Sequence, residues 1–300
     1  MIIELTDTSS RDVAAALINA KRTAGASGMV LTLLIVTEDD HFDEVLSAAK
    51  ASATAHPSRV IVVTYIDEGP SRLDASIEIG EGMPGDLVVL RLHGELRHHA
   101  DSICLPLLLP DSPTIAWWPN EAPDHLAEDP IGGLADRRIT DAAGCHNPQD
   151  ALLRRARNHS PGDTDLTWTR LTRWRALLAA ALDQSQAEVT GALVVSAPDN
   201  APATLLAAWL SDRLAIPVER FDGEHPGVNE VRLTTTEGDV TVRRVAEGTA
   251  IYQVPHQPQR TVALRRRPLT DLLTEELQRM DADDIFEAAT RRLVADAEGR

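Results

Sequence analysis

The sequence predicts an α/β protein built from two α/β domains of similar helix–strand–helix–strand order. Nearly all-apolar runs, such as MVLTLLIV at residues 29–36, are typical of strands that are covered on both faces. Segments with apolar residues at helical spacing alternate with these runs. The length of 300 residues is enough for two ordinary hydrophobic cores.

Composition limits the classes of partner and compartment. Hydrophobic residues make up 43% of the chain and charged residues 25%, which is typical of a globular protein. The net charge of −17 repels nucleic acid and anionic membranes, so we expect neither as a partner. No signal peptide or membrane-spanning run is visible, and two cysteines are too few for a disulfide framework. We therefore expect a cytoplasmic location.

The expected elements follow from apolar periodicity and from turn residues. The helix from about residue 40 ends near His56, because Pro57 disfavours the α conformation in the preceding residue. The expected helices of the first half are 9–24, 40–56 and 95–105, and its strands are 29–36, 59–66, 73–79 and 86–92. The expected helices of the second half are 149–157, 165–183, 202–214, 268–280 and 282–296, and its strands are 189–196, 217–221, 228–235, 240–245, 250–254 and 261–264.

A domain boundary is expected near residue 160. Residues 119–148 form a long connection rich in Pro, Gly, Asp and Ala, and NHSPGDTD at 158–165 is typical of a hinge. The domains are then residues 1–160, with a Trp–Trp segment and the long connection, and residues 161–300, ending in two helices. Their similar element order suggests an old internal duplication, which different strand orders would rule out.

The segment LPLLLPDSPTIAWWPN at 105–120 carries two adjacent tryptophans, Trp117 and Trp118. On a strand, their indole rings point to opposite faces. One ring can fill the core, and the other must meet a second layer, a neighbouring domain or a partner. The surrounding prolines stiffen the segment, which suits docking and supplies neither a nucleophile nor a general base.

Signatures of catalysis are sparse. GEGMPG at 80–85 matches the dinucleotide pattern in letters, but a strand-like run follows it where a helix is needed, so we expect a turn. His93, His98, His99, Asp101 and Cys104 lie close in sequence without a zinc-site signature; we expect solvated histidines and a buried thiol, and no metal. Cys145 precedes His146 and is either an ordinary loop cysteine or a redox-sensitive thiol.

Arginines supply the remaining candidates. Two readings are open for the group on the 165–183 helix: neutralisation of acidic neighbours, or binding of a partner or anion. A second group precedes a proline that can start a helix, where phosphate can bind, although an exposed edge strand explains it too. The first group interleaves with tryptophans and comprises Trp168, Arg170, Arg173, Trp174 and Arg175; the second comprises Arg265, Arg266 and Arg267.

Four segments together resemble the OpcA family, the bacterial glucose-6-phosphate dehydrogenase assembly proteins. They are, in chain order, HPSRVIVV, LPLLLPDSPTIAWWP, LADRRITDAA and DLTWTRLTRWRALLAAALD. The resemblance is clearest between residues 56 and 183. With the third segment it adds Arg137 and Arg138 to the candidates for partner binding.

The resemblance implies a non-enzymatic protein without cofactor that binds glucose-6-phosphate dehydrogenase, favours its active oligomer and so supports the oxidative pentose phosphate pathway and NADPH supply. It assigns no catalytic residue. Two alternatives stay open: a sensor or enzyme for sugar phosphates that uses the arginines, and a scaffold without effect on activity. The sequence leaves the oligomeric state of the chain undetermined.

Overall fold

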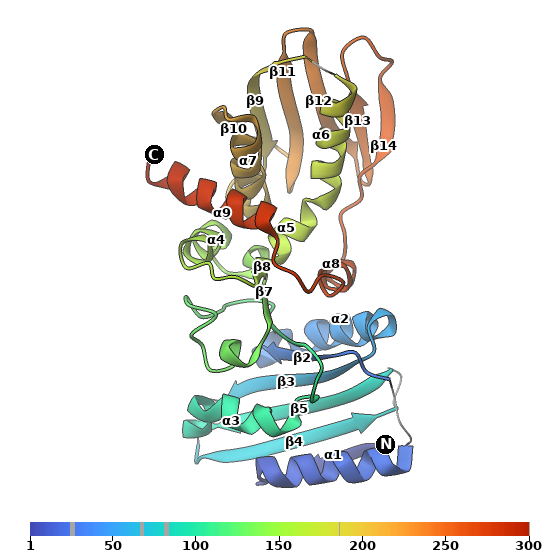
Figure 1. The fold of residues 1–300 in the computed structure, drawn as a ribbon, viewed down its shortest axis with the longest axis vertical. Helices are drawn as coiled ribbons and strands as arrows, with labels where there is room; N and C mark the ends of the chain where they lie inside the picture. The colour runs from blue at the N-terminus through green and yellow to red at the C-terminus, as the bar shows by residue number, and fades with distance from the viewer. Residues whose placement is uncertain (25–27, 67–68, 81–83, 186, 300) are drawn as a thin grey trace. The chain divides into compact units, whose positions relative to one another are not determined.

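The computed structural model describes residues 1–24, 28–66, 69–80, 84–185 and 187–299, and it confirms the mixed α/β class (Figure 1). The chain divides into two compact units. Unit 1 comprises Met1–Thr140, Ser160–Thr164 and Leu269–Ala282; unit 2 comprises Asp141–His159, Asp165–Pro268 and Asp283–Arg300. The division into domains at residue 160 stays a prediction.

Unit 1 contains one sheet flanked by helices. Its helices are α1 (Ser10–Ala24), α2 (Phe42–Ala55), α3 (Ala100–Cys104) and α8 (Leu269–Glu276). The strands of the sheet are β1 (Ile2–Leu5), β2 (Leu31–Val36), β3 (Ser58–Ile66), β4 (Arg72–Ile79), β5 (Gly85–His93), β6 (Thr114–Trp118), β7 (Arg137–Thr140) and β8 (Asp163–Asp165).

The strands of this sheet lie in the order β1-β4-β5-β3-β2-β6-β7-β8. The pairs β5–β3, β3–β2, β2–β6 and β6–β7 are parallel, whereas β4 is antiparallel to both β1 and β5. The parallel strands β2, β3, β5 and β6 are buried along most of their length, as their continuous apolar runs predict. Helices α1 and α3 contribute Val13, Leu17 and Ile103 to the core on one face.

The backbone of Gly85 explains why β5 begins with a glycine. Its backbone has φ +134°, which favours glycine, and a Cβ there would lie 2.0 Å from the carbonyl oxygen of Ser58. Residues 81–83 of the GEGMPG motif lie outside the described residues. Because a strand and not a helix follows Gly85, the motif does not provide the helix N-terminus that binding of a pyrophosphate requires.

Unit 2 contains a second sheet with a single covered face. Its helices are α4 (Pro148–Arg157), α5 (Leu166–Arg170), α6 (Thr172–Gln184), α7 (Ala201–Leu214) and α9 (Asp284–Ala297). Its strands are β9 (Val189–Ser196), β10 (Val218–Asp222), β11 (Val228–Thr235), β12 (Gly238–Ala246), β13 (Thr249–Gln253) and β14 (Arg260–Ala263), in the order β10-β9-β11-β12-β13-β14.

Buried and exposed side chains alternate along β11 and β12, and the buried ones show which face of the sheet is turned toward the core of unit 2. Val231 and Leu233 are buried and alternate with the exposed Arg232 and Thr234. The buried side chains pack with residues of α6 and α7, including Leu178, and Figure 1 shows both helices in front of the sheet. Since β9–β10 is parallel and the other strand pairs are antiparallel, the sheet can leave its second face in contact with solvent.

Several elements differ from the sequence-based expectation. Strands β1, β7 and β8 were not expected, and the expected helix 165–183 is two helices, α5 and α6, which meet at Leu171. The expected helix 95–105 begins as a 3₁₀ helix over Gly94–His99. Sequence signals for short strands such as β1, β7 and β8 are weak, because pairing with a neighbouring strand rather than apolar periodicity creates them.

The hypothesis of an internal duplication does not agree with the sheets. The local order of helices and strands is similar in both halves, but the two strand orders and directions differ. In unit 1 the strand β3 pairs with β5 in parallel, whereas in unit 2 β9 pairs with β11 antiparallel. Because different strand orders rule out a duplication, the two halves are not copies of one domain.

Candidate functional site

Helices α5 and α6 carry the first arginine group and are positioned by buried polar contacts in unit 2. Asp165, 1% exposed, precedes α5; its side chain accepts hydrogen bonds from the backbone N–H of Thr167 at 2.8 Å and of Ala142 at 3.0 Å. The Arg155 guanidinium pairs with the same carboxylate at 3.0 Å. A carboxylate at this end of a helix satisfies otherwise unpaired N–H groups, so the start of α5 is fixed.

The two tryptophans of this group are part of the core. Trp168 is 2% exposed and Trp174 is 3% exposed. The indole N–H of Trp168 donates to Asp283 at 2.9 Å, and its ring lies near the ring of Phe286. Arg175 places its guanidinium carbon 3.4 Å from the Trp168 ring centroid, a cation–π contact. These indoles therefore hold unit 2 together and do not form an exposed surface.

The three arginines of the first group have different environments. Arg170 is bound to Asp141 through two hydrogen bonds of 2.6 and 2.7 Å, so its charge is largely compensated. Arg175 lies over Trp168, as described above. Arg173 is exposed and forms no ion pair or hydrogen bond with the residues that the structure describes. Arg173 is thus the member of this group that is free to bind something else.

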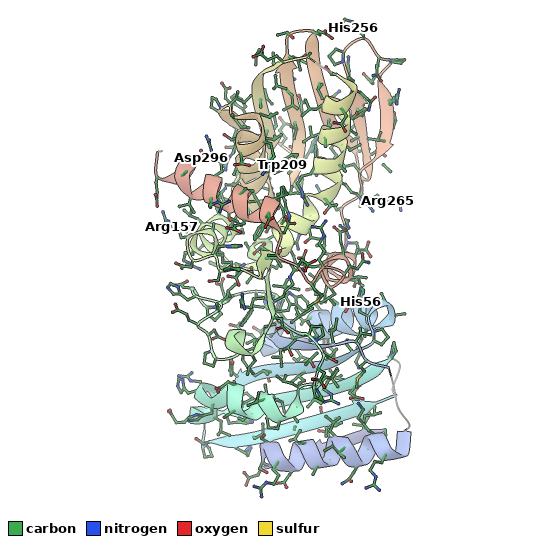
Figure 2. All side chains as sticks on the ribbon, in the orientation of Figure 1. His56, Arg157, Trp209, His256, Arg265 and Asp296 are labelled. Atoms are coloured by element: carbon green, nitrogen blue, oxygen red, sulfur yellow. The ribbon has the colours of Figure 1, made fainter. Side chains whose placement is uncertain are left out.

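The second arginine group comes together with the first around one cavity in unit 2. The cavity has a volume of about 280 Å³. Residues from the β9–α7 loop, α5, α6, β12 and the segment after β14 line it, and Figure 2 shows Arg265 on that last segment. Its arginines are Arg170, Arg173, Arg244, Arg265, Arg266 and Arg267.

Hydrogen bonds to neutral carbonyl groups hold several of these arginines. Arg244 donates to the carbonyl oxygens of Val228 and Leu264, and Arg266 donates to that of Pro226. Such bonds fix a guanidinium without neutralising its charge. Burial, together with repulsion from Arg266, lowers the pKa of Arg244 from its ordinary value, as expected where cations gather.

Arg244 was not among the residues singled out from the sequence. It lies on the same side of β12 as the buried Val240 and Val242, because side chains two residues apart on a strand share a face. An arginine on the inward face of an otherwise alternating strand is a signal that the sequence does contain. Asp199 and Asn200, which also line the cavity, carry no comparable signal.

Trp117 and Trp118 lie in unit 1 and are both covered by protein. Trp117 is 0% exposed and Trp118 is 2% exposed. Trp118 belongs to the core cluster that contains Leu126 and Ile131, and β6 directs Trp117 to the opposite face of the sheet. Both rings are therefore covered by the protein itself, and neither is exposed for a partner in the described part of the chain.

Arg137 and Arg138 are also buried in unit 1. Arg137 is 2% exposed and donates to the Glu276 carboxylate at 2.6 Å and to the carbonyl oxygen of Arg279. Arg138, 7% exposed, forms an ion pair with Asp163. These contacts connect β7 with segments that follow much later in the chain. They give both arginines a structural role in the described part of the molecule.

A second cavity lies in unit 1, at the carboxyl ends of β2, β3 and β6, with a volume of about 670 Å³. The strand order changes direction between β2 and β6, which is where ligands bind in many open parallel sheets. Its lining includes Tyr65 and Trp118 and mixes acidic with basic side chains. Burial raises the pKa of Asp129, which also lines it. This mixture of charges does not indicate a class of ligand.

The cysteines and histidines do not form a common site. Among the described residues, no three His, Cys, Asp or Glu side chains are arranged to hold a metal ion. His93 contacts Asp74 at 3.0 Å, whereas His98 is exposed and Cys104 is buried. Cys145 is buried and not part of a disulfide, and its sulfur lies 3.1 Å from a guanidinium nitrogen of Arg155. None of the described helices has the length and hydropathy that crossing a membrane requires.

Comparison with solved structures and curated proteins adds little. One solved structure that matches part of the chain is described as trehalose-6-phosphate from E. coli bound with UDP-2-fluoro glucose. It is 10% identical, the match covers 64% of this chain and 64% of that chain, less than two thirds of its length, and the TM-score is 0.27. A likeness this low supports no argument about this protein. No curated protein matches the sequence.

Two family models match the chain in succession. One, described as the glucose-6-phosphate dehydrogenase subunit N-terminal domain, matches residues 49–157. The other, described as the C-terminal domain of that subunit, matches residues 161–290. Because the two OpcA models occur in the expected order and cover most of the sequence, the chain belongs to the OpcA family of glucose-6-phosphate dehydrogenase subunit proteins.

Proposed function

We propose that this protein is a non-enzymatic assembly factor and allosteric activator that binds glucose-6-phosphate dehydrogenase. The observation that carries the proposal is the pair of family matches, each described as a domain of a glucose-6-phosphate dehydrogenase subunit. In this role the protein favours the active oligomer of the dehydrogenase. It thereby supports the oxidative pentose phosphate pathway and the supply of NADPH in the bacterial cytoplasm.

The proposed mechanism is a population shift. A protein that binds one conformation or oligomer of an enzyme better than another raises the population of that state. A coupling free energy of about 1–3 kcal/mol changes substrate affinity about 5–150-fold. No catalytic group in this chain is needed for such an effect.

The contact with the dehydrogenase is proposed to include Arg173. This arginine is exposed on α6 and has no partner among the described residues. Arginine is common among residues that contribute strongly to interfaces, since its planar guanidinium binds carboxylates through two parallel hydrogen bonds. Arg170 and Arg175 flank it as positioned neighbours, each already bound within unit 2.

The test is a dehydrogenase assay with and without this protein, using the dehydrogenase of the same organism, beside light scattering of the mixture. We expect higher activity together with a larger complex. Arg173→Ala should weaken the complex by more than about 1 kcal/mol, roughly fivefold or more in Kd. Arg291→Ala, which changes an exposed arginine on α9, is the matched control and should leave the Kd unchanged.

Three outcomes contradict parts of this proposal. A complex without change in activity would identify a scaffold. Turnover of a metabolite by the purified chain alone would identify an enzyme. An Arg173→Ala variant that folds normally and binds with unaltered affinity would remove this residue from the interface.

A further inference from the structure

We infer that the arginine-lined cavity of unit 2 is a binding site for a small organic phosphate, a phosphate monoester dianion on a compact carbon skeleton. Its residues are Arg173, Arg244, Arg265 and Arg266, with Leu171 and Trp174. This inference goes beyond the proposed association with the dehydrogenase and does not depend on it.

The charge around the cavity is the first argument. Four of its arginines form no ion pair with the residues that the structure describes: Arg173, Arg244, Arg265 and Arg266. Asp199 is the acidic residue in the described lining, and Asp141 compensates Arg170. In a chain with a net charge of −17, a concentration of uncompensated cations in one cavity calls for an anion.

Fixed geometry is the second argument. Arg244 and Arg266 are held by carbonyl oxygens, so part of the entropy of ordering them is already lost before a ligand arrives. The Arg265 side chain lies against Gly248, where an added Cβ would be 2.8 Å from the Arg265 Cγ. Guanidinium groups bind phosphate oxygens through paired N–H donors, and held groups bind them with less loss of freedom.

The helix α7 adds a smaller contribution. Asn200 precedes this helix, and both Asn200 and Pro202 line the cavity. The Asn200 side chain already accepts from the Ala203 N–H at 2.9 Å, and a proline has no N–H to offer. The helix N-terminus therefore favours an anion through its dipole rather than through free donors.

Shape and apolar lining identify the rest of the ligand. Leu171 and Leu264 are each 1% exposed and Trp174 is 3% exposed, so they form a floor beneath the arginines. Arg244 lies over the Trp174 ring, with its guanidinium carbon 5.8 Å from the centroid. A volume of about 280 Å³ suits a small molecule rather than a peptide or a nucleic acid strand. The carbon skeleton of an organic phosphate can pack against these apolar side chains. Inorganic phosphate has no such skeleton, so it cannot make these contacts.

Isothermal titration calorimetry with the full chain and no dehydrogenase tests the inference. Glucose 6-phosphate is the organic phosphate probe, inorganic phosphate tests the anion alone, and glucose tests the skeleton alone. We expect saturable 1:1 binding of glucose 6-phosphate, at least tenfold tighter than that of inorganic phosphate. Glucose should not bind measurably, and the affinity for glucose 6-phosphate should fall as salt concentration rises.

Variants locate the site. Arg265→Ala and Arg266→Ala change exposed side chains and should each weaken glucose 6-phosphate binding at least tenfold while the circular dichroism spectrum is preserved. Arg291→Ala on α9 is the control and should bind as the wild type does.

Three results would overturn the inference: no binding of any probe, equal affinity for inorganic phosphate and glucose 6-phosphate, or binding that both cavity variants retain. Since the dehydrogenase is absent, failure here leaves the proposed association untouched. Loss of activation in the dehydrogenase assay equally leaves this inference untouched.

Discussion

Burial of Cys104 gives this residue an unusual acid–base behaviour. The side chain is 0% exposed in the core of unit 1. Burial, with a smaller contribution from the negative charge of Asp101, raises the pKa of the thiol to about 12. At neutral pH the thiol stays protonated and weakly nucleophilic, so this cysteine is a poor candidate for control through oxidation.

The raised pKa of Cys104 makes stability depend on pH. Its contribution is present below the unfolded-state pKa of about 8.5 and is lost as the pH rises from there toward 12, because only the unfolded thiol ionises in this range. We expect the free energy of unfolding to fall by up to about 1.4 kcal/mol per pH unit from this group. In Cys104→Ala this part of the slope should be missing.

Urea unfolding of the wild type and of Cys104→Ala at several pH values between 8 and 10 measures how the free energy of unfolding of each protein changes with pH. The value at pH 7 gives the constant loss from the smaller side chain, which does not alter the slope. Burial also raises the pKa of Tyr65, and this contribution is common to both proteins. Equal slopes for wild type and variant would contradict the assignment.

At the scale of elements, single carboxylates at helix starts organise unit 2. Asp165 caps the start of α5, and Asp283 caps the start of α9. Asp165 lies three residues before Trp168 in the sequence, and Asp283 accepts a hydrogen bond from the indole N–H of Trp168. The Asp283 side chain also accepts from the backbone N–H groups of Ile285 and Phe286, each at 3.0 Å. One carboxylate thus determines where α9 begins and how Trp168 is oriented.

Replacing this carboxylate should destabilise unit 2. Asp283→Ala removes the helix cap, which lowers the free energy of unfolding by about 1 kcal/mol. It also leaves the Trp168 N–H without its acceptor, which lowers the free energy of unfolding by about a further 1–3 kcal/mol. We expect a total loss of about 2–4 kcal/mol in urea unfolding followed by tryptophan fluorescence.

Asp283→Asn is the matched control, because asparagine is also a good helix cap and its side-chain oxygen can still accept the indole N–H. It should lose less than half as much stability as Asp283→Ala. A similar loss in both variants would show that the charge, and not the hydrogen bonds, is responsible.

At the scale of the whole molecule, the chain completes unit 1 with segments that are far apart in sequence. After leaving unit 1 at Thr140, it returns at Ser160–Thr164 and again at Leu269–Ala282. Ion pairs between buried groups accompany both returns: Arg138 with Asp163, and Arg137 with Glu276. The second return places α8 against α2, where the His56 ring contacts the Thr274 carbonyl oxygen at 3.2 Å (Figure 2).

The pair of Arg137 and Glu276 allows a quantitative test. Arg137→Met should destabilise the protein by about 3–5 kcal/mol, because the Glu276 carboxylate, 7% exposed, loses its buried partner. The double variant Arg137→Met, Glu276→Met should recover at least half of this loss, since two apolar side chains can replace a buried ion pair.

Chemical denaturation of the wild type, both single variants and the double variant gives the coupling energy. Arg291→Met removes an exposed pair on α9 and should change stability by less than about 0.5 kcal/mol. Additive effects of the two single substitutions would contradict a direct coupling between Arg137 and Glu276.

The sequence by itself determined the α/β class, because continuous apolar runs and helical periodicity are local patterns that encode burial. It determined most strands and helices, among them β2, β3, α7 and β11. It also identified the OpcA family through long, specific sequence segments, such as the one that contains TIAWWP. It also marked both groups of arginines. The adjacent residues Trp117 and Trp118, and likewise Arg137 and Arg138, were also recognised from the sequence. A local pattern does not reveal whether an indole or a guanidinium group is exposed to solvent or covered by other parts of the protein.

Only the tertiary structure decided which of these side chains are free. It buried the tryptophans and joined Arg137 to Glu276, 139 residues later in the chain. It brought Arg173, Arg244 and Arg265 to one cavity, although they lie on α6, on β12 and after β14. The physical reason is that burial and charge compensation depend on contacts between distant segments, and these contacts exist only once the sheets have formed.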